Sequence, residues 1–501
     1  MSAGGQAVSA SGRAADGATA AKGAVFISIA KIYFMLSGFV QQVLLTRILG
    51  VAEYGAFAVV NNVISIVNNT VVQATIQAVS KFTAEDDARA EAVQRAGVRM
   101  QVVLGAALAG ALFWGAPFVA GFVHAERYTT ALRIAAVIPF LYAVYAVFVG
   151  SANGLRQFRT QATFDIGFST SKTILLLGLA ALWRVNGAFI GFAGAAAFIM
   201  VVASRVMRLP ASAERFPQGR LTGYMGAVVV YGMLLNLALN YDLPILRHFA
   251  GQGAGAGVAD AVGAQYAALR TLALLPYQAL VVVTFVIFPL ISRATFAEDR
   301  EATRVYVTQT LRYAVILVAA MGIVLAARPA ALLGLIYPAA YVAGAPAMPI
   351  LVAGECCLAL LAVACAILNA AGLTRATVSL VAVTVVCGTA AAALLVPRAA
   401  PGAPMLVAAA SATALGMVVG FVASAVYLRA RLGGTPPLAT LGRVALAIAA
   451  GMAVGRFAPG HGRIAGLAAI ALAGVAYVVV LLMTGELGPE DRAKLGRMLR
   501  R

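Results

Sequence analysis

Charged and amide side chains recur at helical spacing inside long apolar stretches of this chain. Lys31, Gly38, Gln42 and Thr46 follow one another at intervals of seven, four and four residues, which places them on one face of a helix. Four further stripes are spaced in this way: Asn62, Ser65, Asn69, Gln73 and Gln77; Asp165, Ser169 and Lys172; Asn236, Asn240 and Arg247; and Tyr266, Arg270 and Tyr277. A guanidinium offers paired donors to anionic oxygens and an ammonium acts as a point charge, whereas amides and phenols suit neutral hydroxyls. Because polar groups inside a membrane normally face a partner or a cavity, the stripes are candidates for binding a polar ligand.

The apolar stretches that carry these stripes are long enough to cross a bilayer. Of the 501 residues 62% are hydrophobic, and about 20 apolar residues cross the hydrocarbon core as a helix. The chain divides into about fourteen such stretches, joined by short connectors. The expected spans are residues 25–48, 56–79, 98–122, 132–152, 165–183, 187–207, 224–248, 263–290, 308–327, 348–370, 377–397, 404–428, 439–457 and 464–484. Their Ala, Gly and Leu content without regular alternation favours helices over barrel strands, so we expect an all-α polytopic membrane protein.

The formal charge of +19 is distributed unevenly between the two sides of the expected membrane. With a cytoplasmic N-terminus, most Lys and Arg residues fall in cytoplasmic connectors and in the C-terminal tail. The opposite side receives far fewer: Arg127, Arg184, Arg328, Arg398, Arg456 and Arg463. This positive-inside bias predicts that both termini are cytoplasmic, which requires an even number of spans. Since the placement accounts for the charge, we expect no nucleic-acid partner.

The terminal segments and the connectors leave little room for other functions. Residues 1–22 are rich in Ala, Gly and Ser and have no apolar core, so we expect a disordered cytoplasmic tail and not a secretory signal. Residues 486–501 form a basic cytoplasmic tail. Cys356, Cys357, Cys365 and Cys387 lie inside expected spans, without disulfide or metal-ligand spacing. We therefore expect no catalytic residues, no metal and no cofactor.

Several short motifs occur twice, in the same order and about 210 residues apart. Residues 150–156 (GSANGLR) and 367–375 (ILNAAGLTR) are Asn-containing turns before a basic residue. Pro117 and Tyr128 in one connection correspond to Pro329 and Tyr341 in another. Two repeats of about six spans each begin and end on the same side, so they predict parallel lobes around a central cavity. The expected divisions are an N-lobe at 23–210, a C-lobe at 211–432 and a two-span extension at 433–485.

The first two spans carry a sequence pattern that resembles a known family. Its elements are residues 33–34 (YF), 45–50 (LTRILG), 53–57 (EYGAF) and 79–82 (VSKF), and a second block has 269–271 (LRT), 275–276 (LP) and 288–292 (FPLIS). This pattern resembles the polysaccharide biosynthesis membrane proteins. They are O-antigen-type flippases of the multidrug/oligosaccharidyl-lipid/polysaccharide exporter superfamily.

The resemblance implies a two-lobed flippase in the cytoplasmic (inner) membrane. It would move a polyprenyl-diphosphate-linked oligosaccharide from the inner to the outer leaflet by alternating access, as a monomer that works with a glycan polymerase and glycosyltransferases. For such a cargo the headgroup candidates are Arg270, Lys31, Arg47, Arg247 and Lys172. The glycan candidates are Asn62, Asn69, Gln73, Gln42, Asn240, Tyr266 and Tyr277. Asp165, Asp242 and Glu355 are candidates for ion coupling.

Each candidate also has a purely structural explanation. Arg47, Arg247 and Lys31 lie near span ends, where a basic side chain can reach the interface as an anchor. The amide stripe can serve as interhelical hydrogen bonding, and Asp242 and Glu355 can neutralise a nearby arginine. Other functions also stay open. A lipid II flippase or a multidrug exporter would share this fold, and a glycosyl polymerase or ligase would need acidic or His residues on a large outer loop.

Overall fold

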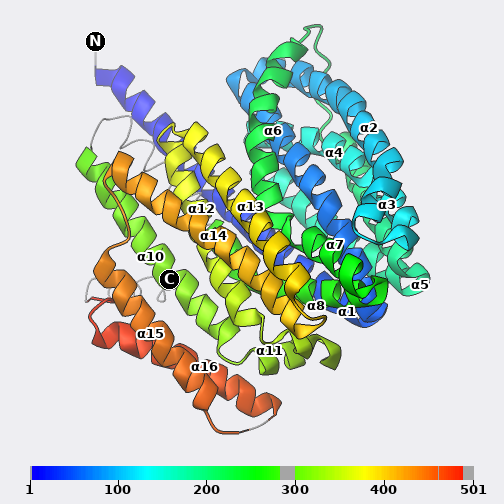
Figure 1. The fold of residues 1–501 in the computed structure, drawn as a ribbon. Coiled ribbons are helices and arrows are strands. Elements are labelled where there is room, and N and C mark those ends of the chain that lie inside the picture. The colour runs from blue at the N-terminus through cyan, green and yellow to red at the C-terminus, as the bar shows by residue number, and fades with distance from the viewer. Residues whose placement is uncertain (1–2, 282–299, 461, 489–501) are drawn as a thin grey trace. The chain divides into compact units, whose positions relative to one another are not determined.

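The structure is a computed structural model that describes residues 3–281, 300–460 and 462–488. Within these residues all regular elements are helices, and the prediction of an all-α fold is confirmed. Eleven described segments are long and apolar enough to cross a membrane, so the chain is a multi-pass membrane protein. It divides into two compact units, Met1–Asn240 and Tyr241–Arg501, and Figure 1 labels the helices of both.

The first unit contains six α-helices and two short 3-10 turns. They are α1 (Ala3–Glu85), η1 (Asp87–Arg89), α2 (Ala90–Phe122), η2 (Glu126–Tyr128), α3 (Thr129–Ala135), α4 (Val137–Gly154), α5 (Phe158–Val206) and α6 (Gln218–Asn240). Helix α1 begins at Ala3, inside the segment for which we expected disorder, and the alanine content there suits a helix. Helix α6 belongs to this unit, although the sequence placed residues from 211 onward in a second lobe. Its Leu221 and Met225 are buried against α1.

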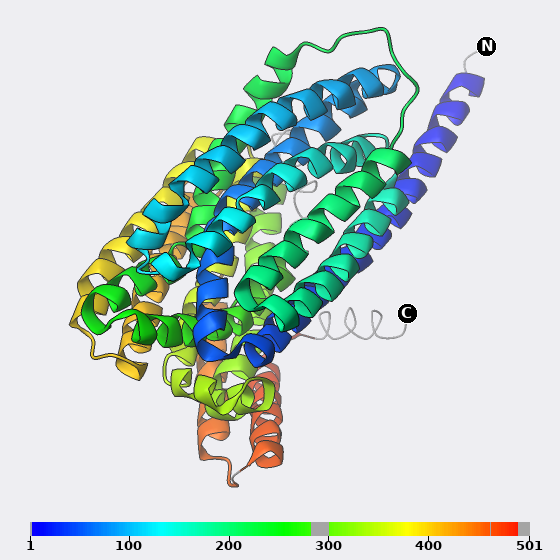
Figure 2. The same ribbon diagram turned by 90° about the vertical axis from the view of Figure 1, so that its right-hand side faces the viewer.

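Helix α1 is a hairpin of two of the expected spans. Gly50 has φ 73° and ψ 179°, which breaks the helix between them, and the two halves run in opposite directions in Figure 2. The hydroxyl of Tyr54 donates to Oε1 of Gln42 at 3.0 Å, whereas twelve residues of straight helix would separate them by about 18 Å. Glycine suits this position because it adopts positive φ without steric cost.

Helix α5 is a second hairpin, broken at Trp183 and Arg184. After the break the chain returns so closely that a Cβ added at Gly187 would lie 1.9 Å from the carbonyl oxygen of Leu179. Small residues permit such close approach of membrane helices.

Arg184 of this turn also ties α5 to the bend in α1. Its guanidinium donates to the carbonyl oxygens of Ile48 and Leu49 at 2.6 and 2.7 Å and pairs with Glu53 at 2.8 Å. The last carbonyls of a helix have no partner within the helix. Arg184 supplies one for the end of the first half of α1.

The second unit begins with two shorter helices. Its elements are α7 (Asp242–Ala254), α8 (Ala256–Ala273), α10 (Arg300–Ala326), α11 (Pro329–Ile336), η3 (Ala339–Gly344), α12 (Met348–Ala370), α13 (Thr374–Leu395), η4 (Val396–Arg398), α14 (Ala403–Leu432), α15 (Leu438–Phe457) and α16 (Arg463–Met483). The helical path is interrupted at Tyr241 and at Leu274, shortly before Pro244 and Pro276. Proline is tolerated in the first turn of a helix but not in its interior.

The described residues account for most of the expected spans. Segments Phe26–Glu85 and Phe158–Val206 have 60 and 49 residues, each at least twice what one crossing needs, and each contains a hairpin. The expected span at 263–290 extends into residues 282–299, outside the described residues. The total of fourteen therefore stays a prediction.

The two turns that the sequence paired as repeats have the same backbone hydrogen bonds. After α4, the amides of Leu155, Arg156 and Gln157 donate to the carbonyls of residues 151, 153 and 152. After α12, the amides of residues 371, 372 and 373 donate to those of 367, 369 and 368 in the same pattern. The second of these three residues has positive φ in both turns, 57° at Arg156 and 77° at Gly372. The two turns are therefore conformationally equivalent.

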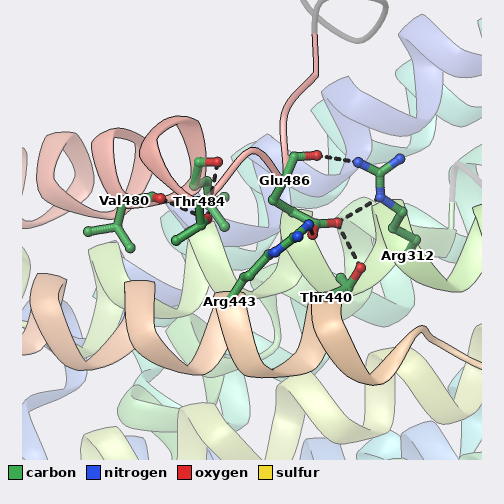
Figure 3. Close-up of polar contacts among 7 residues, drawn as sticks. Arg312, Thr440, Arg443, Val480, Thr484 and Glu486 are labelled. Carbon is green, nitrogen blue, oxygen red and sulfur yellow. Dashed lines mark hydrogen bonds and ion pairs between the residues drawn. The ribbon is translucent and has the colours of Figure 1, made fainter.

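Helices α15 and α16 form a hairpin that packs on α10, and one acidic residue bonds to side chains of both α10 and α15. Glu486, 1% exposed, follows α16 and accepts hydrogen bonds from Arg312 of α10 and from Thr440 and Arg443 of α15, at 2.7, 2.7 and 3.0 Å (Figure 3). Its backbone carbonyl accepts a further bond from Arg312. One carboxylate thus joins three helices.

Candidate functional site

In the first unit, the seam between α1 and α5 is polar. Nζ of Lys31 lies 2.8 Å from Oδ2 of Asp165, with 49% and 12% of the side chains exposed. Further along the same seam, Tyr33 pairs with Thr170 at 2.8 Å, and Ser37 pairs with Thr173 at 2.7 Å. A headgroup candidate and an ion-coupling candidate thus form one ion pair. Beyond this ion pair, the seam continues as a row of hydrogen bonds between neutral side chains.

Two of the glycan candidates meet between α1 and α6. Nδ2 of Asn62 donates to Oδ1 of Asn240 at 3.1 Å, and Asn240 in turn donates to the carbonyl of Asn236. Asn69 and Gln73 lie on an exposed face of α1. The amide stripe therefore has two parts, one used for contact between helices and one exposed.

The remaining basic candidates of this unit have different surroundings. Nζ of Lys172 lies 3.9 Å from the centre of the Phe192 ring, within the α5 hairpin, a distance typical of a cation–π contact. Arg47 is exposed near the end of the first half of α1, a position that suits an interface anchor as well as a ligand contact.

In the second unit, Asp242 is the centre of a buried polar cluster. Its Oδ2 accepts a hydrogen bond from the hydroxyl of Tyr266 at 3.0 Å and lies 3.1 Å from Nε of Arg270. Its Oδ1 accepts the backbone amide of Leu243 at 2.9 Å. The Tyr266 hydroxyl also contacts Oγ1 of Thr413 at 2.9 Å. Three helices, α7, α8 and α14, supply this cluster.

Glu355 of α12 adds a second carboxylate to the cluster. It is 1% exposed and interacts electrostatically with Arg270 and Asp242. With both carboxylates ionised, the cluster holds two negative charges against the single positive charge of Arg270. The expectation that either acid neutralises an arginine holds for Asp242, while Glu355 is the excess charge. Tyr277 is half-buried beyond the end of α8.

Arg247 forms a separate ion pair with Asp260. Both side chains are fully buried, between α7 and α8. A headgroup role for Arg247 would require this pair to open. The interpretation of Arg247 as an interface anchor is wrong, because an anchor reaches the membrane surface whereas this side chain is enclosed by protein.

Three of the five basic candidates are therefore paired with carboxylates: Lys31 with Asp165, Arg270 with Asp242 and Arg247 with Asp260. At these three positions each positive charge therefore lies next to a carboxylate. Sequence reasoning missed Asp260 and Thr413. Neither has a local motif, because each acts on a residue of another helix.

No metal site or disulfide is found in the described part of the chain. Within these residues no group of three His, Cys, Asp or Glu side chains is placed to hold a metal ion. The four cysteines are free thiols in α12 and α13. The polar clusters described above consist of ion pairs and hydrogen bonds, which suit the binding of a charged or polar ligand.

Comparison with protein families adds to this geometry. The model of the polysaccharide biosynthesis protein family matches residues 20–295, more than half of the chain. The chain belongs to this family. The match includes the two blocks of sequence that carry the resemblance, together with Lys31, Asp165, Asp242 and Arg270. No curated protein sequence matches this polysaccharide biosynthesis protein significantly.

Solved structures show which fold this polysaccharide biosynthesis protein has. A lipid II flippase MurJ in an inward closed conformation has a TM-score of 0.76 and 11% identity, with 92% of this chain and 99% of that chain covered. An inward-facing multidrug resistance MATE family transporter of the MOP superfamily has a TM-score of 0.63 and 14% identity, with 82% and 98% covered. A MOP superfamily transporter from Pyrococcus furiosus has a TM-score of 0.62 and 12% identity, with 82% of this chain and 96% of that chain covered. The fold is therefore that of the MOP superfamily, as the resemblance implied.

Proposed function

We propose that this polysaccharide biosynthesis protein is a flippase. It moves a polyprenyl-diphosphate-linked oligosaccharide from the inner to the outer leaflet of the cytoplasmic membrane by alternating access. The family supports a role in polysaccharide synthesis, and the MOP fold supports transport. The observation that carries the proposal is the buried Asp242–Arg270 pair, whose guanidinium can offer a diphosphate paired donors.

In this proposal the diphosphate competes with Asp242 for Arg270. A guanidinium already held by a carboxylate attracts a second anion weakly, so Asp242 must be neutralised when the headgroup binds. A proton or a cation on Asp242 or Glu355 would do this, because an uncompensated carboxylate at membrane depth is costly. The diphosphate thus replaces Asp242 at Arg270 only when a proton or cation neutralises the carboxylate. In this way binding of the cargo is linked to binding of an ion.

The exposed amides of α1 suit the glycan in this proposal. Asn69 and Gln73 present neutral donors and acceptors of the kind that sugar hydroxyls need. An inside-negative potential favours outward movement of two charges by about 4.6 kcal/mol per 100 mV. Ion coupling is therefore compatible with transport but not required by its energetics. The glycosyltransferases that build the cargo and the polymerase that extends it are the expected partners.

A lipid II flippase is the second candidate. The similarity over 92% of the chain to a lipid II flippase favours it, and that cargo too is a polyprenyl diphosphate. The two candidates predict the same headgroup chemistry and differ in the sugar. A transport assay that offers both cargoes therefore separates them.

The test is transport by the purified protein in liposomes. Labelled polyprenyl-diphosphate oligosaccharide is placed in the inner leaflet, and its arrival outside is measured with an added glycosidase. We expect Arg270→Gln to slow transport by about 10- to 100-fold, since a hydrogen bond to a charged group contributes about 1.5–3 kcal/mol. Arg456→Gln, at an exposed arginine of α15, serves as the control and should leave the rate unchanged.

A further variant separates the headgroup role from folding. Arg270→Lys keeps the positive charge but loses the paired N–H donors of the guanidinium, so it should retain part of the transport rate. A folded Arg270→Gln protein that transports at the wild-type rate would sink the headgroup role, and transport of lipid II alone would favour the second candidate.

A further inference from the structure

The first unit carries a groove that has no part in the proposed function. It has a volume of about 690 Å³ and lies where α2, α3, α4 and α5 meet, the helices labelled together in Figure 1. This volume falls within the range of small-molecule sites, about 300–1,000 Å³. Its lining is almost wholly apolar, and it includes one charged side chain, that of Arg133.

The groove faces the hydrocarbon of the bilayer. Phe113, Val137 and Ile190 line it and keep 39%, 42% and 39% of their surface exposed. In a chain that crosses the membrane, exposed apolar side chains of this kind contact lipid. The lining runs from Thr130 to Leu141, about 16 Å of helix, which matches one leaflet of a hydrocarbon core about 30 Å thick.

Arg133 gives the groove a charged end. It lies in α3, one turn after the 3-10 connection η2, and therefore near the membrane surface. Its guanidinium carbon is 5.3 Å from the centre of the Phe113 ring. Among the described residues no acceptor pairs with its buried Nε–H. Burying part of a charged group without an acceptor is costly, so the end of the groove suits an anionic oxygen.

We propose that this groove binds one anionic phospholipid of the adjacent leaflet, with its phosphate at Arg133 and an acyl chain along Leu141 and Gly194. Charge complementarity selects the headgroup, and the match to one leaflet in length selects a membrane lipid. Thr130, exposed at the same end, offers a hydroxyl to a second phosphate oxygen. The proposal does not depend on the cargo of the flippase.

Native mass spectrometry of the purified full chain tests this site. The protein is extracted from vesicles of equal phosphatidylglycerol and phosphatidylcholine, and the ratio of the two bound lipids is measured. The wild type should retain phosphatidylglycerol preferentially. Arg133→Gln should lower the ratio about fivefold, the factor that corresponds to about 1 kcal/mol for one basic residue near an anionic lipid, whereas Arg133→Lys should keep most of it.

Two more variants distinguish the groove from general surface charge. Arg127→Gln removes an arginine six residues away, outside the groove, and should leave the ratio unchanged. Gly194→Leu fills the groove, because a Cβ there meets no atom closer than 3.8 Å, and should reduce retention of both lipids without loss of folding. An unchanged ratio in folded Arg133→Gln would overturn the proposal. So would preferential retention of an added polyprenyl phosphate over phosphatidylglycerol, which would assign the groove to the cargo.

Discussion

Arg247 and Asp260 illustrate how a buried charge depends on one partner. Both are fully buried, so removing either leaves the other uncompensated in protein. Replacing a buried pair with apolar residues of similar volume is often neutral or stabilising, whereas removing one partner costs about 3–5 kcal/mol. The two outcomes differ enough to measure.

We expect Arg247→Met to destabilise the second unit by about 3–5 kcal/mol and Arg247→Met with Asp260→Leu to recover most of that loss. Thermal unfolding can be followed with a thiol-reactive dye, because all four cysteines lie in α12 and α13 of the same unit. A double variant as unstable as the single variant would mean that the pair has a structural role beyond charge compensation.

At this scale the sequence predicted positions better than partners. Periodicity identified Asn62, Asn240, Tyr266 and Arg270 as polar groups on helix faces, and the structure brings them into hydrogen bonds or ion pairs. It gave no indication that Lys31 meets Asp165, because 134 residues separate them. A helical stripe shows which direction a side chain faces. It contains no information about which other helix packs there.

At the scale of elements, Glu486 bonds the α15–α16 hairpin to α10. Burial acts to raise the pKa of this carboxyl, but hydrogen bonds from Arg312, Thr440 and Arg443 outweigh burial and leave the pKa below its ordinary value. A carboxyl with a lowered folded pKa stabilises the fold at pH values above its unfolded pKa, about 4.3. This contribution is lost as the pH falls through the folded pKa.

Glu486→Gln should therefore destabilise the protein at pH 7 by about 1.5–3 kcal/mol, and the difference from wild type should shrink progressively below about pH 4.3. Denaturant unfolding in detergent at a series of pH values measures this. Glu301→Gln is the matched control, since Glu301 of α10 is 73% exposed and pairs with Arg304 in its own helix. Its effect should stay below about 0.5 kcal/mol. A Glu486→Gln effect that is independent of pH would contradict the assignment.

Helix boundaries could be predicted where the composition of the chain changes. The position of a helix was less predictable where it depends on packing against another helix. Expected span ends at 48 and 183 fall within two residues of the observed breaks at Gly50 and Trp183. The placement of α6 was not predictable, because it depends on Leu221 and Met225 packing on α1. Apolar composition favours burial there but does not specify which helix provides the contact.

For the whole molecule, the positive-inside distribution makes a topological prediction. Single cysteines can be introduced by Ala213→Cys, in the α5–α6 connection, and by Pro459→Cys, in the α15–α16 connection, in a chain that lacks the four native cysteines. With both termini cytoplasmic, a membrane-impermeant maleimide added to intact cells should label residue 459 and not residue 213. Labelling of 213 alone would invert the topology. Labelling of both or neither would place the two positions on the same side and exclude the odd number of spans expected between them.

The bend of α1 has a consequence for biosynthesis. The carbonyl of Leu49 receives its hydrogen bond from Arg184, which is 135 residues later in the chain. At about 5–20 residues per second, the ribosome needs about 7–27 s to make that stretch. During this interval the first hairpin is already in the membrane without its cap, and the translocation machinery or interfacial water must satisfy its carbonyls. The N-terminal helices of this protein therefore reach their final form only after the fifth span has been made.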